Sequence, residues 1–209
     1  NDEHVNILID CGPDFRTQAL RAGIDRLDAV IVTHQHYDHV GGLDDLRPLG
    51  HIDIYGEQNV IDAIKRNLSY SFGPHHYPGS PRLEPHVIRP SEPFHIGHLT
   101  IEPLRVLHGP LPIVGFRIGR MAYITDAKML PDDTLDRLHD LDLLIINALR
   151  ITPHPSHLNL DEAVDLVNRL RPRNTYFTHF SHDIGRHAAT DATLPKGMHL
   201  AYDMLQLTL

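Results

Sequence analysis

Several apolar runs of the chain end directly in histidine or aspartate, and this arrangement limits the folds that the sequence can form. "VIVT" leads into "HQHYDH" at residues 34–39, "LRVL" into His108, "AYIT" into Asp126, and "TYFT" into His179. Neighbouring strands bring their carboxyl ends to one edge of a sheet, which is where open α/β folds place their sites. We therefore expect these polar side chains to gather at one edge of a sheet.

Helical and extended patterns alternate toward both ends of the chain, with a run of strands between them. "PDFRTQALRAG" (13–23) predicts a helix that ends at its last glycine. "NLDEAVDLVNRLRP" (159–172) opens with Asn159 and has Glu162 three positions on, which is the spacing of a capping box. The alternation predicts a layered α/β fold, and the length fits a single domain over residues 1–209.

Residues 69–98 are rich in proline, glycine and histidine and show no sustained period, so we expect an irregular insertion there, as a loop or a partly extended segment. Its histidines either line a substrate entrance or decorate the surface. They are His75, His76, His86, His95 and His98. Arg82 and Arg89 are its only formal cations.

The composition excludes several classes of protein. The formal charge of −8 argues against a surface that collects long nucleic acid. The single cysteine, Cys11, rules out an internal disulfide framework and is best read as a small buried residue. No apolar run approaches the ~20 residues of a membrane span, and no signal peptide is visible. We expect a cytoplasmic protein without a membrane partner, and a homodimer is compatible with the sequence.

The polar stretch after "VIVT" has the spacing of a metal site. His34 and His36 are two positions apart, so in an extended segment they point to the same side and can bind one ion. Asp38 and His39 follow where the chain turns toward a Gly-Gly pair, and they can reach a second ion. The mixed set of imidazoles and carboxylates favours two divalent ions, Zn²⁺ first and Mn²⁺ or Fe²⁺ as alternatives.

The histidines and aspartate at the other strand ends complete this scheme. His108 adds to the first site and His179 to the second, while Asp126 can bridge both ions through its two oxygens. Asp10 also ends a predicted strand, and it either hydrogen-bonds a metal ligand or caps the helix that follows.

"THQHYDHVGGL", His108, "YITD" and "THFSH" together resemble the metallo-β-lactamase superfamily of dinuclear metallohydrolases. Within it the chain is most similar to the branch with the phosphodiesterase of the carbon–phosphorus lyase pathway, and more distantly to tRNA 3′-processing endonucleases. The markers of that branch are Asp126 in place of a cysteine, "SHLNLDEAV" and "THFSH".

The resemblance implies a four-layer αββα sandwich of the metallo-β-lactamase type. It also implies that His157 faces the substrate, as a general acid or as a hydrogen-bond donor to phosphoryl oxygens. The metal ligands that it implies are His34, His36, Asp38, His39, His108, Asp126 and His179.

The chain departs from the family pattern in two places. The first strands and the Gly-rich turn that normally precede "ILIDCG" are absent, so we expect an N-terminally incomplete domain. Some members carry a structural zinc bound by upstream cysteines and the second histidine of "THxSH". That histidine is His182, which is either a ligand without its partners or a hydrogen-bond donor to a ligand.

The function expected from this resemblance is hydrolysis of small cyclic or nucleotide phosphodiesters by a metal-bridging hydroxide, with Asp38, Asp126 and His157 as the catalytic residues. A thioester or lactone hydrolase would use the same metals on a carbonyl and would place apolar residues around them. A tRNA 3′-processing endonuclease would need a basic arm, and a non-catalytic metal-binding module is the remaining alternative.

Overall fold

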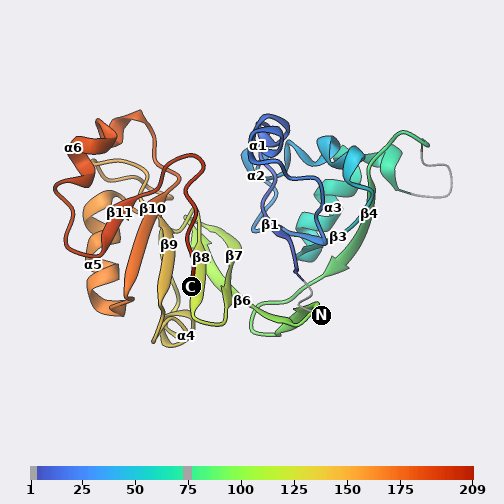
Figure 1. Cartoon of the computed structure of the whole chain (residues 1–209). Coiled ribbons are helices and arrows are strands. Elements are labelled where there is room, and N and C mark those ends of the chain that lie inside the picture. The colour runs from blue at the N-terminus through green and yellow to red at the C-terminus, as the bar shows by residue number, and fades with distance from the viewer. Residues whose placement is uncertain (1–3, 73–76) are drawn as a thin grey trace. The chain divides into compact units, whose positions relative to one another are not determined.

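The chain folds into two compact units, residues 1–99 and residues 100–209 (Figure 1). This computed structural model describes residues 4–72 and 77–209, so His75 and His76 lie outside the described residues. Every helix within those ranges is too short or too polar to cross a bilayer.

The first unit is built on a parallel sheet in the order β1-β2-β3-β4. Its strands are β1 (Ile7–Ile9), β2 (Ala29–Ile31), β3 (His51–Gly56) and β4 (Arg82–Val87). The helices of the unit are α1 (Phe15–Ala22), α2 (Tyr37–Val40) and α3 (Gln58–Asn67). Two 3-10 helices complete the unit, Leu43–Leu49 between α2 and β3 and Ser69–Ser71 after α3. The short strand β5 (Phe94–Ile96) comes shortly before the end of the unit.

The core of the first unit forms where alternate strand residues meet the apolar faces of the helices. Ile52 and Ile54 of β3 are fully buried and belong to one cluster with Phe15 of α1 and Val60 of α3. Gly23 ends α1 in a left-handed conformation, as the sequence predicts, with its N–H donating to the Ala19 carbonyl.

Residues 69–98 are partly extended where the structure describes them, because β4 and β5 lie within that range. Pro85 of β4 hides the strand signal because proline cannot donate to a ladder. The proline is tolerated at this position because β4 lies at the edge of its sheet.

The second unit holds strands in the order β11-β10-β9-β8-β7-β6. These are β6 (Leu99–His108), β7 (Leu111–Ile118), β8 (Met121–Ile124), β9 (Leu143–Asn147), β10 (Asn174–Thr178) and β11 (Met198–Leu200). Its helices are α4 (Asp132–Asp136), α5 (Leu160–Leu170) and α6 (His187–Asp191), with a 3-10 turn at His182–Ile184.

The parallel part of this second sheet sets up the functional edge. The pairs β8-β9, β9-β10 and β10-β11 are parallel, whereas β6-β7 and β7-β8 are antiparallel. The carboxyl ends of β8, β9 and β10 therefore face one edge, and Asp126, Asn147 and His179 lie at or just past those ends. This is the arrangement expected for Asp126 and His179. His34, His36, Asp38 and His39 follow β2, which belongs to the other sheet, so the prediction of a single sheet edge is wrong for them.

Candidate metal centre

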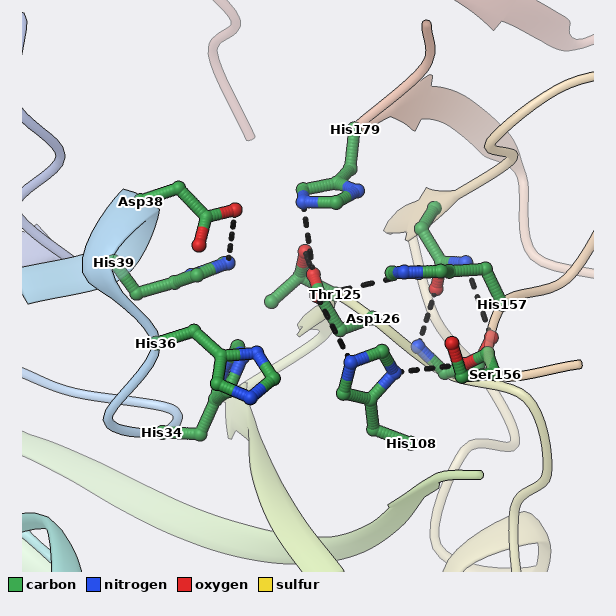
Figure 2. A network of polar contacts seen from close by, with 12 residues as sticks. His34, His36, Asp38, His39, His108, Thr125, Asp126, Ser156, His157 and His179 are labelled. Carbon is green, nitrogen blue, oxygen red and sulfur yellow. Dashed lines mark hydrogen bonds and ion pairs between the residues drawn. The ribbon is translucent and has the colours of Figure 1, made fainter. Parts of the chain in front are cut away.

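The first unit brings His34 and His36 together just after β2. The Nε2 atom of His34 lies 3.0 Å from the Nδ1 atom of His36, and Figure 2 shows the two rings side by side. Two nitrogens that bind one tetrahedral Zn²⁺ at the usual bond length are about 3.3 Å apart. The pair therefore has the spacing of two ligands on one ion.

Asp10 orients the histidines of this unit. Its Oδ2 atom accepts a hydrogen bond from His39 Nδ1 at 2.7 Å and from the Thr33 hydroxyl at 2.8 Å. Because that hydroxyl gives its one hydrogen to Asp10, its oxygen can accept from His34 Nδ1, which is 3.0 Å away. The network assigns the proton of both rings to Nδ1 and leaves Nε2 of His34 and His39 to bind a metal.

Asp38 and His39 form the second pair of donors in this unit. The Oδ2 atom of Asp38 lies 3.3 Å from His39 Nε2, again the spacing of two ligands on one ion. His39 is buried, whereas the Asp38 side chain is 60% exposed. The pair lies on α2, which follows the extended residue His36 and turns both side chains toward the same region (Figure 2).

The loop that carries these donors is fixed by close backbone packing. Cys11 N–H donates to the His39 carbonyl at 2.7 Å, and Gly42 N–H donates to the Cys11 carbonyl at 2.9 Å. A Cβ atom at Gly42 would lie 2.1 Å from the Gly12 carbonyl oxygen. Only glycine allows this approach, so the Gly-Gly pair after the motif is a packing requirement.

Asp126 is the centre of the donor group in the second unit. Its Oδ1 atom lies 3.2 Å from His179 Nε2, and its Oδ2 atom lies 3.8 Å from His108 Nε2 (Figure 2). Each carboxylate oxygen thus faces a different histidine. With a histidine beside each oxygen, Asp126 has neighbours suited to metal binding.

His108 is oriented by a backbone group. Its Nδ1 atom donates to the Ser156 carbonyl at 2.8 Å, which leaves Nε2 to face Asp126. The loop that supplies this carbonyl is held by Leu158 N–H, which donates to the Ala127 carbonyl at 2.7 Å. The loop after β9 therefore helps to set the position of a ligand that ends β6.

His157 is buried beside this group. Its Nδ1 atom has no hydrogen-bond partner within residues 4–72 and 77–209 and lies 4.0 Å from Asp126 Oδ2. Burial lowers the pKa of His157 to about 4, against the raising effect of Asp126. A neutral imidazole can donate an N–H hydrogen bond but is a poor proton donor at pH 7, which favours the hydrogen-bonding role of the two that the family resemblance implies.

Three residues of the site hold left-handed backbone conformations that non-glycine residues rarely adopt. Asp10 has φ of 59°, Asp126 of 55° and His179 of 52°, and each lies within two residues of a strand end. Such conformations cost about 1–3 kcal/mol each and gather at functional sites. Each of these residues lies just past the end of its own strand, where the chain leaves the strand direction.

The structure also places functional residues that the sequence did not reveal. Thr33 and the Ser156 carbonyl orient ligands, as described above. The amide of Asn147, fully buried at the end of β9, bonds both the N–H and the carbonyl of Ala127, next to Asp126. The sequence offered one signal for Asn147, which is the single polar residue at the end of the apolar run "LLIIN". It offered none for Thr33 or Ser156, because contacts of a hydroxyl or a backbone carbonyl leave no spacing pattern in a sequence.

His182 lies apart from these donors. Its side chain is 94% exposed and pairs with Asp183 at 3.4 Å. Within the described residues it belongs to none of the groups of donors that could hold an ion. Its role as a structural zinc ligand or an orienting donor stays a prediction.

The donor chemistry of both units fits divalent metal ions. Each unit presents buried imidazole nitrogens with a carboxylate oxygen, and the group Asp126, His157 and His179 could hold an ion within the second unit alone. Imidazole and carboxylate together suit Zn²⁺, Mn²⁺ and Fe²⁺.

Curated relatives fall into two groups. The chain is 45% identical over 209 residues to an octanoyltransferase of Porphyromonas gingivalis strain W83, which covers 98% of the chain and 42% of that protein. The chain thus spans less than half the length of that relative. It is 27% identical over 214 residues to a ribonuclease Z of Mycobacterium bovis strain BCG Pasteur, covering 85% of the chain and 76% of that protein.

Solved structures agree with the predicted fold. A diphosphatase of the PhnP family is 38% identical, with a TM-score of 0.89 over 97% of the chain and 79% of that structure. Zn²⁺-bound PqqB from Methylobacterium extorquens is 18% identical, with a TM-score of 0.78 over 97% of the chain and 83% of that structure, and it supports the fold alone. These neighbours confirm the α/β class of the metallo-β-lactamase type.

A family model settles the resemblance drawn from the motifs. The model of the beta-lactamase superfamily domain matches residues 5–180, which include every donor described above. The PhnP-family neighbour is consistent with the branch that the motifs indicate. The chain belongs to the beta-lactamase superfamily.

Proposed function

We propose that the chain is a dinuclear metal-dependent hydrolase that cleaves small phosphodiesters, cyclic or nucleotide-like. The observation that carries this proposal is the carboxylate of Asp126, whose two oxygens face His179 and His108 separately. Oxygens that each face a separate histidine allow the carboxylate to contact one ion at each oxygen, as a two-ion site needs.

The ligands divide into two sets under this proposal. By the family pattern, His34, His36 and His108 would hold one ion, and Asp38, His39 and His179 would hold the other, with Asp126 contributing to both. Divalent ions bound there supply positive charge to phosphoryl oxygens and lower the pKa of water. The assignment of the two sets rests on family membership and on the donor geometry found within each unit.

The protein's own residues hold these ions and receive the substrate. Asp10 orients His39 directly and orients His34 through the Thr33 hydroxyl. In both rings this leaves Nε2 available to bind a metal. His157 donates an N–H hydrogen bond to a phosphoryl oxygen, where negative charge increases during the reaction. Asp38 is the more exposed carboxylate, with a side chain that is 60% exposed.

The related proteins support phosphoryl chemistry. The PhnP-family neighbour is named a diphosphatase, and several relatives are named ribonuclease Z. Processing of tRNA is a weaker candidate for this chain because its formal charge is −8 and residues 69–98 hold two arginines as their only formal cations. A small anionic substrate needs only local positive charge, which the ions provide.

The name of the octanoyltransferase relative does not favour acyl transfer by this chain. Acyl transfer through a covalent intermediate needs an activated nucleophile. Cys11, the single cysteine, is 1% exposed, and burial raises the pKa of its thiol to about 12, with added effects of Asp45 and Asp10. A thiol in this state is not a nucleophile at neutral pH.

A substrate panel tests the proposal. Metal-loaded wild type and Asp126→Ala are compared on bis-p-nitrophenyl phosphate, a cyclic nucleotide, a thioester and a lactone. We expect hydrolysis of the two phosphodiesters and a loss of about 100-fold or more in Asp126→Ala, since the bridging carboxylate is removed. Turnover of the thioester or lactone alone contradicts the phosphodiesterase assignment.

A further inference from the structure

The backbone of Ala127 is held by one buried side chain. Asn147, the last residue of β9, accepts from Ala127 N–H through Oδ1 at 2.7 Å and donates to the Ala127 carbonyl through Nδ2 at 3.1 Å. Both residues are fully buried. An amide turned the other way would lose both bonds, so the hydrogen bonds define the orientation of the side chain.

This amide takes over where the pairing of two strands ends. β8 and β9 pair as far as Ile124, which lies opposite Ile146. The chain then leaves the sheet through Asp126, whose left-handed φ is 55°. A non-glycine residue keeps such a conformation only where its surroundings hold it. Asn147 gives the residue after Asp126 the donor and the acceptor that a neighbouring strand would otherwise supply.

The same carbonyl also holds the loop that carries His157. Leu158 N–H donates to the Ala127 carbonyl at 2.7 Å, so this oxygen accepts from both Leu158 and Asn147. His157 comes directly before Leu158, and its Nδ1 atom lies 4.0 Å from Asp126 Oδ2 (Figure 2). A displacement of Ala127 would therefore move Asp126 and His157 together.

We propose that Asn147 is a positioning residue, which sets the carboxylate of Asp126 for metal and the ring of His157 for substrate through a single backbone unit. Its part in substrate contact rests on the proposed function, whereas its part in metal binding needs only the donors described above. Without the amide, Ala127 N–H would be buried with no acceptor. The segment would then shift to find another partner and carry the carboxylate with it.

Metal affinity tests the first part of the proposal. Asn147→Leu removes both hydrogen bonds with a side chain that branches at the same carbon. We expect it to lower Zn²⁺ affinity about tenfold or more in competition with a chelating dye, although every ligand remains. Unchanged affinity overturns the inference.

Thr134→Val is the matched control for a loss of stability. The Thr134 side chain is 1% exposed, and its hydroxyl donates to the Arg105 carbonyl at 2.7 Å within the same unit. The control variant thus loses a buried hydrogen bond, as Asn147→Leu does, but should bind Zn²⁺ like the wild type. An equal loss of affinity in Thr134→Val would mean that Asn147 acts through stability alone.

The absorption spectrum of bound Co²⁺ separates a positioning role from a structural one, because it depends on the number and geometry of the ligands. At saturating Co²⁺ we expect an altered spectrum for Asn147→Leu and the wild-type spectrum for Thr134→Val. If Asn147→Leu does not fold, Asn147→Ser takes its place. A serine hydroxyl is too short to bond both groups of Ala127 and leaves room for water to satisfy them. A wild-type spectrum in the Asn147 variant that folds overturns the inference.

A double variant tests the link to His157. With Zn²⁺ and bis-p-nitrophenyl phosphate both saturating, we expect Asn147→Leu to lower kcat about tenfold. In a His157→Ala background the same substitution should cost less than threefold, because the group that it positions is already gone. Losses that simply multiply overturn the link. If no phosphodiester is hydrolysed, the proposed function fails, and metal affinity and the Co²⁺ spectrum still decide whether Asn147 positions Asp126.

Discussion

Asp10 links two predicted ligands that lie five positions apart in the sequence. It bonds His39 directly and reaches His34 through the Thr33 hydroxyl. One carboxylate therefore fixes the tautomer of a ligand in each of the two proposed sets. The residue explains why a strand as short as Ile7–Ile9 ends in an aspartate with a left-handed backbone.

Replacing Asp10 should weaken metal binding without removing a ligand. Asn tolerates the left-handed φ of 59°, but its amide cannot accept from His39 and the Thr33 groups together. We expect Asp10→Asn to lower metal affinity about 10- to 100-fold in a competition titration with a chelating dye. Asp25→Asn, at an exposed carboxylate, is the control, and equal affinity of the two variants would refute the orienting role.

Cys11 should be inert in the native protein. The thiol is 1% exposed and its pKa is raised to about 12, so the reactive thiolate is scarce and inaccessible. We expect labelling by a disulfide reagent at pH 8 to be about 100-fold or more slower in the native protein than in guanidinium chloride. Fast stoichiometric labelling of the native protein would contradict this burial.

The sequence predicted the donors better than their supports. His34, His36, His108 and His179 stand out because imidazoles are unusual in the turns after strands, and Asp126 follows a strand in the same way. Thr33, Ser156 and Asn147 orient or flank them through hydroxyl, backbone and amide contacts, which depend on the folded chain path. No spacing in a single sequence encodes those contacts.

Helix α5 begins with the capping box that the sequence predicts. Asn159 Oδ1 accepts from Glu162 N–H at 2.9 Å, and Glu162 accepts from Asn159 N–H at 3.0 Å. Lys128 pairs with Glu162 at 2.8 Å and lowers the pKa of that carboxyl against the effect of burial. The cap therefore anchors the loop that carries His157.

Removing this cap should destabilise the protein by about 1 kcal/mol. Asn159→Ala loses the acceptor for Glu162 N–H, whereas Asn159→Asp keeps it and loses only the amide bond to the Ile151 carbonyl. Urea unfolding of both variants checks the prediction. Equal losses would mean that the Ile151 contact, and not the cap, carries the stability.

The Gly-Gly turn offers a second prediction at the scale of elements. Gly42→Ala should cost about 3 kcal/mol or more, since its Cβ would overlap the Gly12 carbonyl oxygen and force two loops apart. Gly23→Ala meets no atom within 4 Å and bears only the strain of φ 66°, about 1 kcal/mol. Urea unfolding should rank the two in this order, and the reverse order would contradict the close packing.

Local sequence signals indicate some elements clearly and others poorly. β3 forms over "HIDIYG" because the apolar residues of this run alternate cleanly. β4 was missed because Pro85 interrupts its pattern. α6 was missed because its five residues, none of them buried, carry no apolar face.

At the scale of the whole molecule, the proposed ligands extend from His34 to His179 and come from both compact units. Each unit holds its own donors in an orientation suited to metal, through Asp10 in the first and through Ser156 in the second. Ions that bind donors from both units would stabilise the folded chain, because the unfolded chain does not present them together.

The metal content per chain tests this account most directly. Wild type and Asp126→Ala are loaded with Zn²⁺ or Mn²⁺, dialysed, and measured by native mass spectrometry together with elemental analysis. The account predicts two ions per wild-type chain and no more than one in Asp126→Ala, because the bridging carboxylate binds both. A wild-type chain that holds one ion or none, or a variant that still holds two, would contradict it.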